Sequence, residues 1–208
     1  LVMTGLHTHI PLYDGSKPYN ILFFHYCFVY NRLGNKSQTS TFEMLNPFPL
    51  NIEKTKEFFE RFLIEISVNK SAPIVIYDKK RTVEAFESIL KLLPAKEAEI
   101  NDIKSRLVDL HVIFAERWYF NPKLNGSTQL EDVISDLSPE LNWKDLQNND
   151  TRNLRLDFVY SKQFPESENE KLKKIYRLLA SGLMRATWNF VETKIENYSL
   201  KTQKKAKH

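Results

Sequence analysis

Residues 21–30 read ILFFHYCFVY, a run rich in aromatic and β-branched side chains. A membrane-spanning helix needs about 20 apolar residues, so this shorter run predicts a largely buried strand instead. A turn signal at residues 34–37 leads into residues 39–45, which we expect to pair back as a hairpin strand until the prolines of residues 46–49 end it. A shorter apolar run at residues 1–6 precedes it. The first quarter of the chain therefore predicts three strands in a meander.

Helical periodicity dominates the rest of the chain. Apolar side chains recur at helical spacing in four segments, which we expect to be helices: residues 51–68 (capped by Asn51), 82–93, 98–114 and 168–198. Between the first two lies the continuous apolar run Pro73–Tyr77, which is typical of a buried parallel strand. This order predicts an α/β fold of the ribonuclease-H-like type, a mixed sheet flanked by helices with a helical C-terminal part, and not a doubly wound dinucleotide fold.

Composition bounds the remaining possibilities. The 208 residues are 42% hydrophobic and 27% charged, which predicts one globular domain, residues 1–200, followed by a basic tail, residues 201–208. The net charge of +4 is compatible with nucleic acid. The single cysteine, Cys27, excludes an intrachain disulfide and a cysteine-based zinc site, so we expect a cytoplasmic protein. We expect no membrane span. Because the chain begins at Leu1 rather than methionine, we expect a fragment of a longer protein.

Three blocks of sequence, taken in order, carry a family likeness. The blocks are Ile10-Pro11-Leu12-Tyr13-Asp14-Gly15 with Pro18-Tyr19, then Val75-Ile76-Tyr77-Asp78, and then Arg106–Leu110, Tyr119-Phe120, Gly126-Ser127, Val133, Leu137 and Leu141–Leu146. Over residues 1 to about 193, this sequence resembles the bacterial family called domain of unknown function 2779. That family looks like a DnaQ-type 3′–5′ exonuclease of the four-acid class, and it often follows a Cas4-like nuclease domain. The resemblance implies a DnaQ-like fold and a partner nuclease domain in the parent chain.

The acids that such an exonuclease needs are missing here. Its chemistry uses two Mg²⁺ or Mn²⁺ ions held by carboxylates from separate elements. The resemblance implies an Asp and a Glu on the first strand, an acid four residues beyond position 78, and a Tyr and an Asp four residues apart on the last helix. The residues at those positions are Val2 and Thr4, Thr82, and Ser181 and Arg185. Asp78, which replaces a usual Asn, is the acid nearest the old site. We therefore expect no catalytic residue, no bound metal and no cofactor.

Other polar residues suggest binding sites. The basic residues Lys79, Lys80 and Arg81 follow a strand near the ancestral cleft, and together with Arg185 they are candidates for contacting DNA or RNA phosphates. The pair His7 and His9, with Asp14, could hold a metal, although polar surface is the simpler interpretation.

Three functions remain open. The leading hypothesis is a catalytically inactive exonuclease-like domain that serves as a nucleic-acid-binding or scaffolding module of a larger nuclease-related protein. The second is an active metal-dependent 3′–5′ exonuclease, using Mg²⁺ or Mn²⁺ at a relocated acidic site chosen from Asp78, Glu84, Asp102 and Asp109. The third is a protein-interaction domain without a nucleic-acid role.

Overall fold

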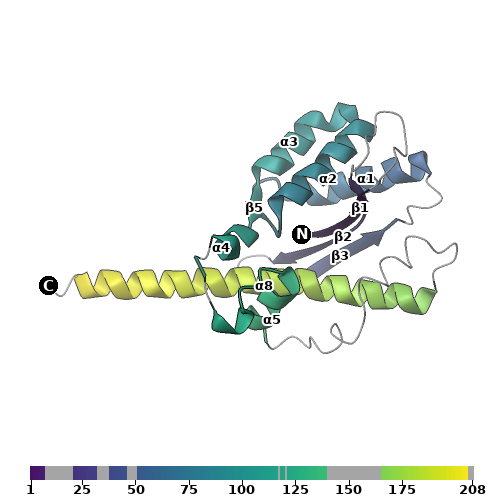
Figure 1. Cartoon of the computed structure of the whole chain (residues 1–208). Helices are drawn as coiled ribbons and strands as arrows, with labels where there is room; N and C mark the ends of the chain where they lie inside the picture. Colours follow the sequence, from purple (N-terminus) through teal and green to yellow (C-terminus); the bar gives the residue numbers. More distant parts are fainter. Residues whose placement is uncertain are drawn as a thin grey trace.

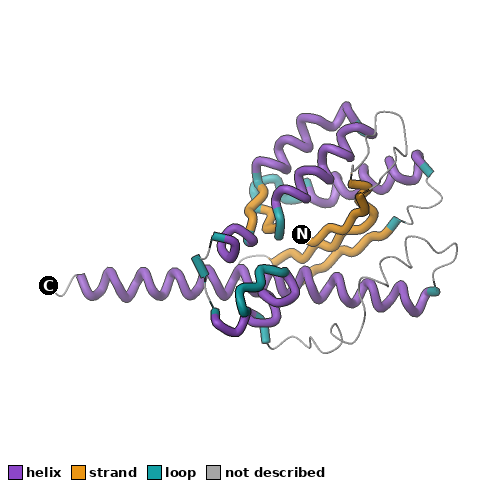
Figure 2. The backbone as a smooth tube through the Cα atoms, in the orientation of Figure 1, coloured by secondary structure: helices purple, strands orange, loops and turns teal. Residues whose placement is uncertain are grey.

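A computed structural model of the chain describes residues 1–7, 21–31, 38–45, 51–116, 118–119, 121–139 and 165–205. The fold is mixed α/β. Strands β1 (Val2–His7), β2 (Ile21–Asn31) and β3 (Gln38–Met44) form an antiparallel sheet in the order β1-β2-β3, which confirms the predicted meander. Strands β4 (Ile74–Ile76) and β5 (Leu107–Asp109) form a separate parallel pair. Figure 2 shows both groups of strands in orange.

Helices cover both faces of the three-stranded sheet (Figure 1). The described helices and 3-10 turns are α1 (Ile52–Ile66), α2 (Lys79–Leu92), η1 (Pro94–Lys96), α3 (Glu97–Ser105), α4 (His111–Ala115), η2 (Pro122–Leu124), α5 (Leu130–Leu137) and α8 (Glu166–Lys205). One hydrophobic cluster joins the sheet to α1, α2 and α3, and a second joins it to α4, α5 and α8. Strand β2 contributes to both clusters, Phe23 and Tyr26 to the first and Phe24 and Cys27 to the second. Burial on both faces explains its unbroken apolar sequence.

The sheet and the parallel pair meet at the start of β1. The nitrogen atom of Leu1 donates a hydrogen bond to the carbonyl oxygen of Val75 on β4, over 2.8 Å. The residue just before β1 is therefore in hydrogen-bond contact with β4, although β1 pairs only with β2 and β4 only with β5 among the described strands.

The predicted helix over residues 98–114 is wrong. In its place the chain forms α3, then strand β5, then the short helix α4. Helix α3 ends at Ser105, and the next three residues pair in parallel with β4, so that Leu107 is buried. The backbone pairing offered by β4 outweighs the helical spacing of the side chains, which is a tertiary effect that local periodicity does not contain.

The other predicted elements agree with the structure to within a few residues, apart from the end of the last helix, which was predicted near residue 198 and lies at Lys205. The side-chain oxygen of Asn51 accepts a hydrogen bond from the backbone N–H of Lys54 over 2.9 Å, which confirms the predicted cap of α1. Helix α2 begins at Lys79, three residues before the predicted start, because Asp78 caps it. The predicted turn at residues 34–37 and the prolines of residues 46–49 lie outside the described residues.

The long helix α8 runs along the sheet and continues past the rest of the molecule toward the C-terminus (Figure 1). It includes residues 201–205, which belong to the segment predicted as a basic tail. Within the described part of the chain, no helix combines the length and the apolar character needed to cross a membrane.

Gly5 is required where β1 passes β2. The strand register shifts between Thr4 and Gly5, and a Cβ atom on Gly5 would lie 2.9 Å from the carbonyl oxygen of Leu22 and also collide with the side chain of Ile21. Because the Leu22 contact is with backbone, we expect Gly5→Ala to lower the free energy of unfolding by about 1–3 kcal/mol. Urea denaturation would measure the loss. An unchanged urea midpoint would show that β1 and β2 can move apart to admit the methyl group without loss of stability.

Candidate functional site

A pocket of about 490 Å³ opens where β4 and β5 end. Its walls come from the first residues of β1, the start of β2, the first turns of α2, the segment before α5 and one stretch of α8. The carboxyl ends of parallel strands are a common location for ligand sites in α/β proteins, because the chain leaves the sheet there and exposes loop and helix-terminal groups. This pocket is the candidate functional site.

Apolar side chains form much of the pocket lining. They include Val2 of β1, Phe23 of β2, Ala85 of α2 and Leu179 of α8. Val2 is only 8% exposed and Phe23 is fully buried. A lining of this kind supplies contact surface and cannot ligate a hard cation, which prefers oxygen ligands.

The N-terminus of α2 brings polar groups to the pocket. Asp78 has a left-handed backbone, with a φ of 72°, and its carboxylate accepts a hydrogen bond from the backbone N–H of Arg81 over 3.1 Å. The hydroxyl of Thr82 donates to the carbonyl oxygen of Asp78 over 2.9 Å. Thr82 is 7% exposed. The tight turn therefore fixes both Asp78 and Thr82, and it presents the Arg81 side chain at the pocket.

The opposite wall is held together by Thr128. The hydroxyl of Tyr77 donates to the carbonyl oxygen of Thr128 over 2.5 Å, and Nε2 of His111 lies 3.4 Å from the Thr128 hydroxyl. Burial raises the pKa of the Tyr77 hydroxyl, and the carboxylates of Asp109 and Glu131 raise it further. Tyr77 is therefore a neutral hydrogen-bond donor at this wall, and its surroundings are acidic.

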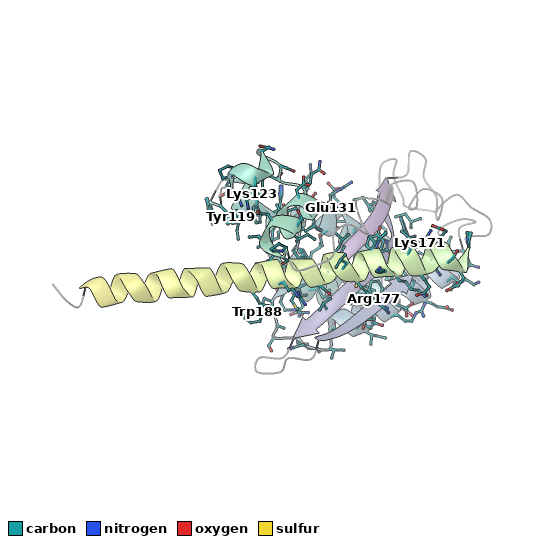
Figure 3. The ribbon with its side chains drawn as sticks, turned by 90° about the horizontal axis from the view of Figure 1, so that it is seen from below. Tyr119, Lys123, Glu131, Lys171, Arg177 and Trp188 are labelled. Carbon is teal, nitrogen blue, oxygen red and sulfur yellow. The ribbon has the colours of Figure 1, made fainter. Side chains whose placement is uncertain are left out.

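Helix α8 contributes Tyr176 to the pocket. Tyr176 is 1% exposed, and its ring centroid lies 3.5 Å from that of the buried His25 on β2. The contact fixes the Tyr176 ring against the sheet. Figure 3, seen from below, shows α8 crossing the sheet, with Glu131 on the same side of the helix as Tyr119 and Lys123.

The positions predicted to form a degenerate metal site are only partly brought together. Val2, Asp78 and Thr82 line the pocket. The backbone of Thr4 lies on β1 opposite His25. Ser181 and Arg185 are on α8, but they are not among the pocket-lining residues. Within the described ranges, no group of three or more His, Cys, Asp and Glu side chains is arranged to hold a metal ion.

The predicted phosphate-binding side chains lie together on the first turn of α2. Lys79, Lys80 and Arg81 are all exposed, and Arg81 also lines the pocket. Helix α2 has no acidic residue in its first turn. Arg185 lies on α8, partly buried, and does not join this basic group at the pocket.

The acids of the relocated-site hypothesis do not share one site. Of the four, Asp78 alone lines the pocket. Asp102 of α3 pairs with Arg106, the residue that follows the helix, with 3.2 Å between Oδ2 and Nε. Both carboxylate oxygens of Asp109 accept backbone hydrogen bonds. His9 and Asp14 of the predicted histidine site lie outside the described residues.

Sequence reasoning missed four polar residues of the pocket: His111, Thr128, Gln129 and Tyr176. His111 could have been found, because it follows the carboxyl end of a strand, but that strand was predicted as helix. Tyr176 shared a helical apolar face with core residues, and the sequence carries no signal that separates a pocket-lining tyrosine from a core tyrosine.

The profile of one protein family matches residues 5–129, which is more than half of the chain. The family is described as domain of unknown function 2779 (DUF2779). The chain belongs to this family. The matched residues include β4, the Asp78 turn and the basic first turn of α2, whereas Val2 and Thr4 precede the DUF2779 match and α8 follows it. No curated protein and no solved structure matches the chain significantly.

Proposed function

We propose that this DUF2779 chain is a non-catalytic exonuclease-like domain that binds a nucleic-acid strand at the pocket between β1 and α2. One observation carries the proposal. Val2 and Thr82, which occupy positions where the resemblance expects metal-binding acids, line one pocket together with Asp78. The Val2 side chain has no ligand atom, and the neutral Thr82 hydroxyl, which donates to the Asp78 carbonyl, lacks the negative charge of a metal-binding carboxylate. The pocket thus keeps the location of the ancestral site and has lost the ligands for two metals.

The strand arrangement supports a ribonuclease-H-like ancestry. The bond from the Leu1 nitrogen to the Val75 oxygen joins β1 to β4. The pairings give β3-β2-β1 in one sheet and β4-β5 in the other, and one sheet joined at β1 and β4 would have the order β3-β2-β1-β4-β5. Three antiparallel strands followed by two parallel strands is the mixed sheet that the element order of the sequence predicts. We propose this order as the fold of the domain.

Helix α8 fits the resemblance better if the family pattern is aligned with it five residues earlier. The exonuclease pattern places a tyrosine and, four residues later, an acid on one helical face. Tyr176 lines the pocket, and the residue four positions later is Ala180, which is 3% exposed. We therefore propose Tyr176 and Ala180, rather than Ser181 and Arg185, as the positions descended from that pair. The expected tyrosine is then present, and its acid has become an alanine.

Phosphate binding would come from the basic first turn of α2. The charges of Lys79, Lys80 and Arg81 are exposed on the first turn of α2, and Arg81 is the one of the three that lines the pocket. No described residue forms an ion pair with Arg81. The far wall carries Glu131, and Asp132 is the next residue along the chain; both carboxylates would repel phosphate. A strand would therefore run along α2 and direct a base or sugar toward the apolar lining, away from the acidic wall.

Salt dependence tests this proposal. We expect fluorescence-anisotropy titrations with short single-stranded DNA and RNA to give affinities that fall linearly with the logarithm of salt concentration, because phosphate contacts release counterions. Arg81→Gln should weaken binding to all sequences alike and reduce the salt slope by about 1. Lys70→Gln removes the same charge from an exposed loop residue away from the pocket, so it should leave the slope unchanged.

The outcomes separate the three candidate functions. The proposal is supported if Arg81→Gln lowers both the affinity and its salt slope while Lys70→Gln lowers neither. Equal effects in Arg81→Gln and Lys70→Gln would mean that net charge, not the pocket, binds nucleic acid. Absence of any binding by the intact chain would favour the protein-interaction domain, and degradation of the strand with Mn²⁺ would favour an active exonuclease.

A further inference from the structure

We propose that Asp109 is a positioning residue of the pocket. Its carboxylate binds backbone N–H groups at His111 and just before Arg81, and it thereby fixes where the side chains of Arg81 and His111 lie. Asp109 is the last residue of β5 and lies opposite Ile76 on β4. Its Oδ1 accepts hydrogen bonds from the backbone N–H groups of Asp78, over 3.1 Å, and His111, over 2.9 Å. Its Oδ2 accepts from the N–H of Lys79 over 2.9 Å.

These three amides belong to both walls of the pocket. Asp78 and Lys79 begin α2, whose third residue is Arg81, and His111 begins α4. Helix N-termini leave N–H groups without helical partners, and they attract anions. The first turn of α2 holds three cations and no acid, and two carboxylates serve this terminus: the cap Asp78 accepts from the Arg81 N–H, and Asp109 of β5 accepts from the N–H groups of Asp78 and Lys79. One side chain therefore fixes the orientation of two binding residues that are 30 positions apart in the sequence.

The contacts also decide how a ligand phosphate can be held. Asp109 accepts from the N–H groups of Asp78 and Lys79, and Asp78 accepts from that of Arg81, so three backbone donors at the start of α2 are already bonded within the chain. A phosphate at the pocket would thus bind side chains rather than the helix terminus. This part of the inference rests on the proposed function, whereas the clamping of the two walls does not.

The direction in which Asp109→Asn changes the affinity for nucleic acid distinguishes positioning from a simple electrostatic effect. Asp109 carries a negative charge near three basic side chains. If it acted only through that charge, Asp109→Asn would strengthen the binding of nucleic acid, because a repulsive charge is removed. If it positions Arg81, the same variant weakens binding, because the asparagine side chain presents one acceptor oxygen instead of two.

Amide hydrogen exchange of the intact chain tests the clamp without any ligand. In Asp109→Ala and Asp109→Asn we expect the amides of Asp78, Lys79 and His111 to exchange at least about tenfold faster, while amides of β2 keep their protection. Asp136→Ala is the matched control, since Asp136 accepts hydrogen bonds only from the side chains of Asn121 and Tyr119 among the described residues. It should leave those three amides unchanged.

Chemical rescue tests the anion role. Added formate should raise the Tm of Asp109→Ala and restore protection of the three amides, because it can occupy the vacated anion position, and it should do neither in the wild type or in Asp136→Ala. Unchanged exchange at the three amides in both Asp109 variants would overturn the proposal, and so would faster exchange spread evenly over the whole sheet. The proposal would also fail if formate did not stabilise Asp109→Ala, or if it stabilised the wild type and Asp136→Ala equally. If Asp109→Ala does not fold, Asp109→Asn carries the exchange test.

The affinity measurement adds the link to function. Weaker strand binding by Asp109→Asn, with the salt slope unchanged, supports positioning, whereas tighter binding contradicts it. If the wild-type chain binds no nucleic acid, the proposed function fails, and the exchange and rescue results still decide the role of Asp109 independently.

Discussion

Replacement of Phe62 by alanine is expected to lower the free energy of unfolding by about 3–5 kcal/mol. Phe62 is fully buried on the inner face of α1. Its ring centroid lies 5.0 Å from that of Tyr26, 5.1 Å from Phe23, 5.6 Å from Phe28 and 5.7 Å from Phe86. The side chain thus joins α1 to β2 and α2, and its loss leaves a cavity lined by rings that cannot collapse without moving the sheet. Equilibrium denaturation in urea measures the change.

A control on the same helix separates packing from helix stability. Ile64 is 64% exposed on α1, so Ile64→Ala should change the free energy of unfolding by no more than about 0.5 kcal/mol. Similar losses in the two variants would show that α1 does not anchor the sheet, contrary to the packing described for the first hydrophobic cluster.

Restoring acids to the pocket should make stability depend on metal. The variant Val2→Asp/Thr82→Asp places two carboxylates beside Asp78 at positions that are 8% and 7% exposed. Unpaired buried charge costs about 3–5 kcal/mol, so the variant should unfold much more easily than the wild type. Mn²⁺ would recover much of the loss, because it binds carboxylates that only the folded state brings together. Thermal unfolding with and without Mn²⁺ measures both effects.

A third acid tests the register of α8. If Tyr176 and Ala180 descend from the exonuclease pair, adding Ala180→Asp to the double variant should increase the Mn²⁺-dependent rise in Tm, whereas adding Arg185→Asp should not. The opposite ranking would support the register of Ser181 and Arg185. If Mn²⁺ raised the Tm of the wild type as much as that of the variants, the introduced acids would not be the metal ligands.

Much of the fold could be predicted from local signals. The aromatic run of β2 indicated a largely buried strand, and Asn51 capped its helix as predicted. Strand β5 could not be predicted in this way. It has three residues, and its neighbours Ile103 and Phe114 continue a helical spacing of buried side chains, so only pairing with β4 determines its conformation.

The pocket was harder to predict than the fold. Val2, Asp78 and Thr82 were found because they depart from a family pattern, and they do line the pocket. His111 and Thr128 come together only through the parallel pair and the segment before α5, so their proximity is a tertiary property. Asp109 was considered as a possible metal ligand, but a residue type alone does not show that three backbone amides already occupy its oxygens.

Under the proposed function, this chain keeps the location of an exonuclease site without the means to hold its metals. Isothermal titration of the wild-type chain with Mn²⁺ tests that claim most directly, with the acid-restored variant as the positive control. The account predicts no saturable binding to the wild type and clear binding to the variant. Two tightly bound ions in the wild type, lost on Asp78→Asn, would contradict it.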